Sequence, residues 1–186
     1  MEFDNTLEVP LPPDETWKVL LDIKRIATCI PGAELTEVVD DTTYKGKVAV
    51  RVGPVALSLH GHAKLEEVDE AGLRVRVKTH GADPKGRGGA DSVIDFRLEA
   101  AGTATKVLIH SDVKLSGSIA QYGRGSGMIQ SMASQLIAQF GEALRTQIAS
   151  GTAAPAKPIS GLTVLGKAAW DSVAGSSDRK DPNRQG

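Results

Sequence analysis

Hydrophobic and polar residues alternate along most of the chain between residues 33 and 115. One side of each predicted strand is rich in Val, Leu and Ile and the other in Lys, Arg, Asp and His, in the runs 44–52, 55–65, 73–79, 94–98 and 107–115. A period of two is typical of a β-strand with one buried and one solvated face. Short turns rich in Gly and Asp separate the runs, so the pattern predicts antiparallel hairpins. A similar run at residues 3–9 brings the predicted sheet to about seven strands.

Helical periodicity appears on both sides of this region. After the prolines at residues 10–13, we expect Asp14 to cap a short helix, and a second short helix should follow until residues 30–32 stop it. A long helix is predicted near the C-terminus, where apolar residues recur every three or four positions: Ile129, Ala133, Leu136, Ile137, Phe140, Leu144 and Ile148. A sheet with one apolar face must cover that face. The predicted fold class is therefore α+β, a curved antiparallel sheet wrapped around the long C-terminal helix, with two short helices after the first strand.

The predicted domain comprises residues 1–150, and the chain beyond it has a different composition. Residues 151–158 form a flexible Pro- and Ala-rich linker, and residues 175–186 form a disordered tail. Between them, residues 159–174 are predicted to form an amphipathic helix that binds a membrane surface through Leu162, Leu165, Ala169, Trp170 and Val173. Docking of this helix on a partner protein is the alternative.

Composition narrows the functional class. The chain has 186 residues, with 22 Lys and Arg against 23 Asp and Glu, so its net charge of −1 gives no reason to expect a nucleic acid partner. The single cysteine, Cys29, excludes an internal disulfide and is expected to be a buried small residue rather than a nucleophile. The N-terminus does not have the pattern of a signal peptide, and no apolar run approaches the roughly 18 residues of a membrane span. We therefore expect a cytoplasmic protein.

No set of residues in the sequence resembles a catalytic centre, so we expect a protein without enzymatic activity. The four histidines, His60, His62, His80 and His110, fall on the polar side of their strands. A zinc site formed by three of them is conceivable, but solvated histidines are the favoured interpretation and no metal is predicted. Glycines at residues 123–127 resemble a phosphate-binding loop but lack the Walker lysine, and we interpret them as the start of the last helix. Tyr44 and Tyr122 are the only inward titratable candidates.

The residues predicted to face inward are small, and aromatic residues make up only 4% of the chain. A curved sheet facing one helix then leaves space for an apolar ligand, with a fully packed core as the alternative. The predicted ligand-binding residues are Ile30, Val50, Leu59, Val77, Ile94, Phe96, Tyr122, Met128, Ile129, Met132, Ala133, Leu136 and Phe140. The opening should lie between residues 30–32 and residues 122–128.

Several segments, in their order and spacing, resemble one family. They are residues 22–34, Val52-Gly53-Pro54 followed by His60-Gly61, the loop at residues 81–89, Gly102-Thr103, and residues 117–124 before the final helix. Together they resemble the CoxG family of carbon monoxide dehydrogenase subunits across residues 1–148. This family is similar to the polyketide cyclase and START-like (SRPBCC) superfamily, whose helix-grip fold agrees with the predicted architecture.

The resemblance implies a function as well as a fold. It implies a non-catalytic accessory protein of a molybdenum hydroxylase of the carbon monoxide dehydrogenase and xanthine oxidase type. Such a protein would bind a lipophile, with an isoprenoid quinone as the candidate ligand, and would recruit the enzyme to the cytoplasmic face of the inner membrane. No covalently bound cofactor is expected. The alternatives are an assembly or maturation factor for the hydroxylase and a cyclase- or aromatase-like enzyme acting on a hydrophobic substrate.

Overall fold

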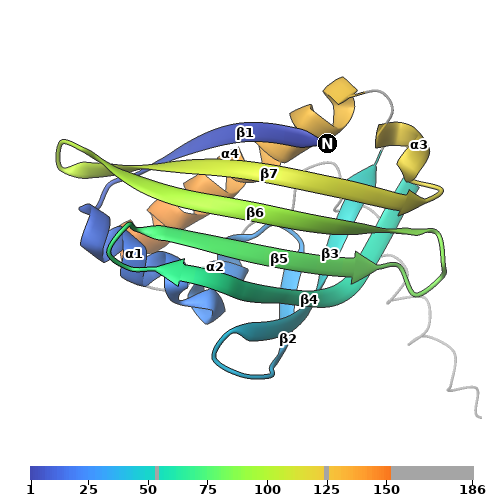
Figure 1. Ribbon diagram of the computed structural model, residues 1–186, viewed down its shortest axis with the longest axis horizontal. Coiled ribbons are helices and arrows are strands. Elements are labelled where there is room, and N and C mark those ends of the chain that lie inside the picture. Colours follow the sequence, from blue (N-terminus) through green and yellow to red (C-terminus); the bar gives the residue numbers. More distant parts are fainter. Residues whose placement is uncertain (53–54, 124–125, 152–186) are drawn as a thin grey trace, which may run out of the picture.

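The computed structural model describes residues 1–52, 55–123 and 126–151, which form one curved sheet with helices against its inner face (Figure 1). The strands are β1 (Glu2–Val9), β2 (Ala33–Val38), β3 (Thr43–Val52), β4 (Val55–Asp69), β5 (Arg74–Ala82), β6 (Gly88–Ala101) and β7 (Ala104–Gly117). The helices are α1 (Pro13–Leu21), α2 (Ile23–Cys29), α3 (Ala120–Gly123) and α4 (Ser126–Ser150). All seven strands pair antiparallel in the order β1-β7-β6-β5-β4-β3-β2. The predicted helix-grip fold is confirmed.

A row of glycines crosses the sheet where it bends. Gly46 of β3 is the register partner of Gly61 in β4, and Gly61 is the partner of Gly81 in β5. A Cβ atom added at Gly61 would lie 1.7 Å from the carbonyl oxygen of His80. The absence of side chains along this row therefore allows the strands to approach closely.

The two short helices close one end of the sheet. Helix α1 has Pro12 as its N-cap and begins at Pro13, so Asp14 lies in the first turn and does not cap the helix as expected. Its carboxylate still interacts favourably with the positive end of the helix dipole. The carboxylate of Asp22 caps α2 by accepting a hydrogen bond from the backbone N–H of Arg25.

Helix α4 packs across this closed end. The buried core there consists of Leu7, Val9, Trp17, Cys29, Val75, Leu98, Val107, Ile109, Phe140 and Leu144. A polar link ties α2 to α4, because Gln147, which is only 1% exposed, accepts a 2.7 Å hydrogen bond from Arg25 and donates one to Thr28. Cys29 is fully buried, as predicted, and burial raises the pKa of its thiol.

Apart from Gly151, where the described residues end, the predicted linker, the amphipathic helix with its membrane-binding residues, and the tail all lie outside the described residues. None of the helices in the described part of the chain combines the length and hydropathy that crossing a bilayer requires.

Candidate ligand-binding site

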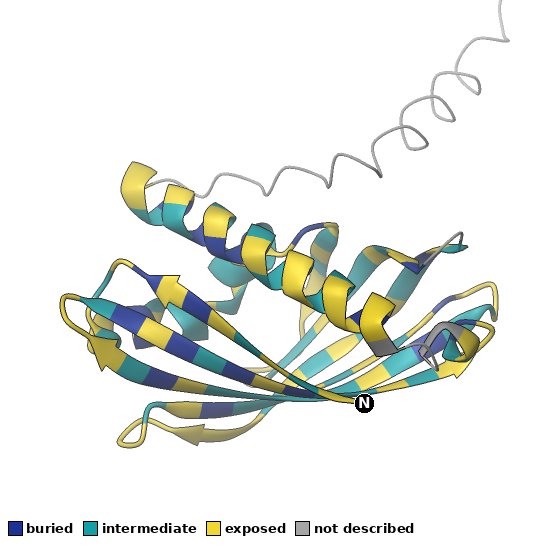
Figure 2. Ribbon diagram, turned by 90° about the horizontal axis from the view of Figure 1, so that it is seen from above, coloured by how far each residue is buried: buried dark blue, intermediate teal, exposed yellow. Residues whose placement is uncertain are grey.

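The inner face of the sheet has two parts that differ in burial. Beneath the C-terminal half of α4 the inward side chains are sealed from solvent, with Val9 0% and Val107 1% exposed (Figure 2). Toward the other end of the sheet, inward residues such as Val48, Val50 and Leu59 are only half-buried. The same alternation of apolar residues therefore builds a packed core at one end, whereas at the other end half-buried apolar residues lie beside a few buried ones such as Leu57 and Ile129.

The structure brings most of the predicted ligand-binding residues to this inner face. Val50, Leu59, Val77, Ile94 and Phe96 come from the sheet and are half-buried, and Val77 and Ile94 are register partners. Met132, Ala133 and Leu136 are half-buried on α4, whereas Ile129 and Phe140 are 4% and 9% exposed. Phe140 belongs to the packed core, and Val77, Ile94 and Phe96 lie against that core. Their role in binding a ligand stays a prediction.

The predicted opening involves two exposed apolar residues. Ile30, after α2, is 38% exposed, and Met128, in the first turn of α4, is 39% exposed. Exposed large apolar side chains at an opening favour contact with a lipophile or with another apolar surface. The side chain of Tyr122 lies outside the described part of the chain.

Three hydroxyl-bearing residues on the inner face, Thr79, Ser92 and Ser111, were not among the predicted ligand-binding residues. Thr79 and Ser92 are register partners whose hydroxyl oxygens lie 2.6 Å apart, and both residues are half-buried. Ser111 of β7 lies on the same face and is 7% exposed. The alternation in each strand places these residues inward, so the same signal that identified the apolar residues would have identified them.

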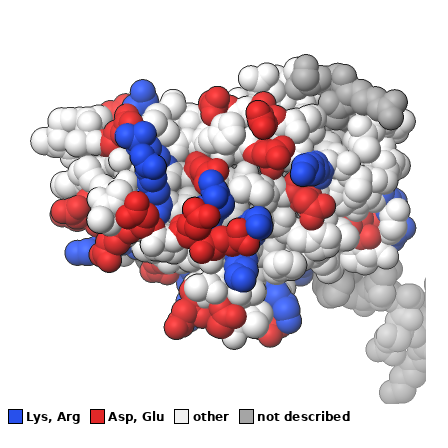
Figure 3. Space-filling view, viewed as in Figure 1, with Lys and Arg blue, Asp and Glu red and all other residues white. Residues whose placement is uncertain are grey.

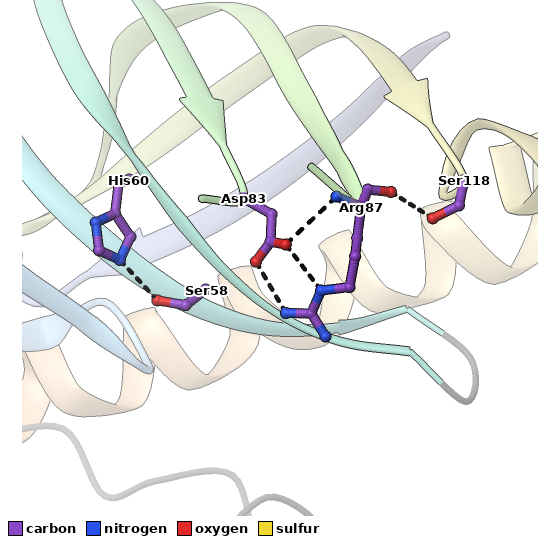
Figure 4. A network of polar contacts seen from close by, with 5 residues as sticks. All are labelled: Ser58, His60, Asp83, Arg87 and Ser118. Carbon is purple, nitrogen blue, oxygen red and sulfur yellow. Dashed lines mark hydrogen bonds and ion pairs between the residues drawn. The ribbon is translucent and has the colours of Figure 1, made fainter. Parts of the chain in front are cut away.

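An ion pair with a buried carboxylate holds the loop between β5 and β6 at the accessible end (Figure 4). The carboxylate of Asp83 accepts hydrogen bonds of 2.8 and 2.9 Å from the guanidinium of Arg87, and the Asp83 side chain is only 1% exposed. The backbone N–H of Ser58 in β4 also donates to this carboxylate. The loop is thereby fastened both to itself and to β4, which gives this end of the sheet a defined shape.

The same loop also contacts the segment between β7 and α3. The backbone N–H and the hydroxyl of Ser118 both donate to the carbonyl oxygen of Arg87 (Figure 4). Gly117 has a φ of +68°, and a Cβ atom there would lie 2.6 Å from Cα of Gly88. This close approach of two backbones requires glycine.

Asp83→Asn is predicted to destabilise the protein at neutral pH. The Arg87 guanidinium holds the pKa of Asp83 well below its usual range. The contribution of a carboxylate with a lowered pKa is complete above its unfolded-state pKa of about 4 and is lost as the pH falls toward its folded-state pKa. Urea unfolding should therefore show a difference between wild type and variant that is largest near neutral pH and shrinks below about pH 4.

Asp41→Asn, at an exposed position in the turn before β3, serves as the control for this test and should leave the urea midpoint nearly unchanged. A difference between wild type and Asp83→Asn that stays constant down to about pH 3 would contradict the role assigned to the ion pair.

Comparisons with known proteins agree with this architecture. The sequence model of the family described as the CoxG subunit of carbon monoxide dehydrogenase matches residues 6–149. The chain belongs to the CoxG family. This confirms the resemblance seen in the sequence motifs. A comparison with curated proteins gave no match.

Solved structures similar to this CoxG family member share its fold at low sequence identity. A conserved protein from Geobacillus kaustophilus aligns with a TM-score of 0.72 and 18% identity, covering 81% of this chain and 97% of the other. The Zhui aromatase/cyclase from Streptomyces sp. R1128 aligns with a TM-score of 0.54 and 18% identity, covering 82% and 98%. A protein from Thermus thermophilus has a TM-score of 0.56 and 17% identity, covering 81% and 99%. At these identities the likeness is one of fold.

All four histidines of this family member lie on the outer face, as predicted. His62 and His80 are register partners with ring centroids 5.8 Å apart, but the Nδ1 atom of His80 lies 2.6 Å from a carboxylate oxygen of Asp91. The Asp4 carboxylate, 2.8 Å from Nδ1 of His110, raises the pKa of His110. Within the described residues, no group of three or more His, Cys, Asp and Glu could hold a metal ion.

The outer face is covered by charged side chains of both signs (Figure 3). A shallow groove of about 400 Å³ lies there, lined by Glu67, Asp69, Arg74, Val75, Arg76, Asp95, Phe96 and Arg97. Arg76 pairs with Glu67 at 2.9 Å and with Asp95 at 2.7 Å across its floor. Such a surface favours water over a lipophile, so the inner face is the better candidate for an apolar ligand.

The two tyrosines named from the sequence do not form a described acid–base pair. The hydroxyl of Tyr44 donates a 2.8 Å hydrogen bond to the carbonyl oxygen of Asp41, at the turn before β3.

The glycine-rich segment at residues 123–127 includes residues 124 and 125, which lie outside the described residues, while Gly127 lies in the first turn of α4. The interpretation of this segment as a phosphate loop therefore gains no support.

Proposed function

We propose that this CoxG family member is a non-catalytic carrier that holds a lipophile between the sheet and α4. The observation that carries the proposal is the half-buried state of inward apolar residues such as Val50, Leu59 and Leu136. Apolar surface that stays accessible costs roughly 25 cal/mol per Å² relative to the same surface covered. An apolar ligand on this face would recover that free energy, and the ligand we propose is a lipophile such as an isoprenoid quinone.

The proposed partner is a molybdenum hydroxylase of the carbon monoxide dehydrogenase and xanthine oxidase type. Membership of the CoxG family supports an accessory role beside such an enzyme. In this role the protein would pass its lipophile between the membrane and the enzyme, and residues 159–174 would bring the complex to the cytoplasmic face of the membrane. The amphipathic pattern of that segment supports membrane recruitment.

Solvent extraction of the purified protein tests the carrier role. We expect mass spectrometry to find a copurified lipophile, and we expect the hydrocarbon dye diphenylhexatriene to become fluorescent on binding the emptied protein. An isoprenoid quinone should displace this dye. Absence of both a lipophile and dye binding would overturn the proposal, because an accessible apolar face must take up one or the other.

Cosedimentation with liposomes tests membrane recruitment. The full chain should pellet with anionic vesicles, whereas a chain ending at Gly151 should remain largely in the supernatant, because the truncated chain has lost the predicted amphipathic segment. The same two proteins without vesicles control for aggregation. Equal pelleting of both chains with vesicles would contradict a membrane role for the C-terminal segment.

A further inference from the structure

Three hydroxyl-bearing residues lie on neighbouring strands of the inner face. Thr79 of β5 pairs with Ser92 of β6, and Ser111 of β7 pairs with Ile94, which is two residues along β6 from Ser92 on the same face. Ser92 and Ser111 are therefore diagonal neighbours, and residues in that relation are about 7–8 Å apart, with their Cβ atoms somewhat closer. The three hydroxyls form a short polar diagonal within an apolar surface.

The diagonal still has hydrogen-bonding capacity. The hydroxyls of Thr79 and Ser92 are 2.6 Å apart, so one donates to the other. A hydroxyl has one donor proton and two acceptor lone pairs. The pair therefore retains one O–H group that can donate to a third oxygen.

Ser111 differs from the other two residues of the diagonal in its burial and in its hydrogen bonding. It is only 7% exposed, its register partners are Phe3 and Ile94, and its hydroxyl makes no side-chain hydrogen bond to another described residue. No polar side-chain atom in the described part of the chain is both fully shielded and unpartnered, so the Ser111 hydroxyl keeps some accessible surface. A hydroxyl held without a partner in an apolar surrounding costs free energy that a ligand oxygen would recover.

The inward residues beside the diagonal keep part of their surface accessible. Gly81 follows Thr79 by two residues on the same face of β5, and a Cβ atom there would lie 3.2 Å from Cβ of Leu59. The inward residues around it, including Leu59 and Val77, are half-buried. Because these side chains are only half-buried, a ligand group can approach the hydroxyls from the inner face.

The inward positions of β4, β5, β6 and β7 carry no charge that would select an ionised ligand. Every inward position of β4, β5, β6 and β7 is apolar, glycine, Ser or Thr. The nearby carboxylate of Asp83 is already paired with Arg87. An ionised headgroup would lose its hydration here without gaining a countercharge, whereas a neutral oxygen needs only a donor.

We propose that Thr79, Ser92 and Ser111 form the polar recognition site for the ligand, which is an uncharged lipophile bearing a ketone or alcohol oxygen. This inference rests on the proposed carrier function and adds the residues that recognise the oxygen of the ligand. The hydroxyls fix the position of the ligand oxygen, and the half-buried apolar residues around them hold its hydrocarbon part.

Dye displacement tests the proposal. Diphenylhexatriene, which has no oxygen or nitrogen, reports binding to the apolar surface, and 2-dodecanone, 1-dodecanol and dodecanoate compete for it. We expect the ketone and the alcohol to compete better than the carboxylate at neutral pH. Two variants remove hydroxyls: Ser111→Ala, and the double variant Thr79→Val with Ser92→Ala. Each should lower the affinity for the ketone by about three- to tenfold, which is the effect of one lost hydrogen bond. Dye affinity should stay the same.

Ser131→Ala, on the exposed side of α4, is the matched control and should change neither affinity. If wild type and all variants bind the dye, but neither hydroxyl variant has a lower affinity for the ketone, the assignment of the recognition site is wrong and the carrier function stands. Stronger competition by dodecanoate than by the ketone would overturn the selection of an uncharged ligand. If wild type binds no dye, both the carrier function and this inference are wrong.

Discussion

Gly61→Ala is expected to destabilise the protein by about 3 kcal/mol or more, because overpacking against a rigid backbone has no easy relief. The added Cβ atom would lie 1.7 Å from the carbonyl oxygen of His80 and 2.8 Å from Cα of Gly81. Both obstacles are backbone atoms of the neighbouring strand, so no side-chain rotation can remove the clash. Strands β4 and β5 would have to separate in the middle of the sheet.

Urea unfolding followed by circular dichroism measures this change in the free energy of unfolding. The matched control is Gly127→Ala, because nothing lies within 4 Å of a Cβ atom at that exposed helical position. Alanine is the better helix former, so this variant should be as stable as wild type or more stable by up to about 1 kcal/mol. A Gly61→Ala variant within about 1 kcal/mol of wild type would contradict the close approach of β4 and β5.

Ala133→Trp is expected to abolish binding of an apolar ligand while leaving the fold intact. Ala133 is half-buried on α4, one turn after Ile129 and on the same side of the helix. If the space between α4 and the sheet is open, the indole ring will fill it and occupy the place of the ligand. We expect the affinity for diphenylhexatriene to fall by more than about tenfold and the free energy of unfolding to change by less than about 1 kcal/mol.

Two measurements on Ala133→Trp separate an open interior from a packed one. In a packed interior the indole would overpack the core and cost about 1–3 kcal/mol. Ala138→Trp places the same ring on the exposed side of α4 and controls for the effect of tryptophan itself. Unchanged dye binding in Ala133→Trp, or a loss of stability in that range, would contradict an open ligand site beneath α4.

Local pattern predicted the elements of this fold well. In β5 the alternation of Val75 and Val77 with Arg74 and Arg76 predicted which side faces inward, and Val75 is indeed buried. The spacing of Phe140 and Leu144 in the last helix predicted the side that packs on the sheet, and both are buried. These features depend on neighbouring residues in the chain, so the period of the pattern is enough to predict them.

The local pattern did not predict the contacts of loops or the first residue of a helix. Asp83 and Arg87 appeared only as part of a turn-rich loop, yet they form an ion pair whose buried carboxylate also fastens the loop to β4. The cap assigned to Asp14 was wrong, because the helix begins at the preceding proline. Both features depend on where a backbone segment lies in space, and the sequence around them allows more than one arrangement.

The sequence by itself determined a one-sided antiparallel sheet, a long helix to cover it, polar placement of the histidines and membership of the CoxG family, since each is carried by local periodicity or by motifs in order. Only the tertiary structure decided that Gly46, Gly61 and Gly81 meet on one row, that the inward residues divide into buried and accessible sets, and that the Ser111 hydroxyl has no side-chain partner among the described residues. These properties depend on strand register and sheet curvature, which bring together residues far apart in the chain.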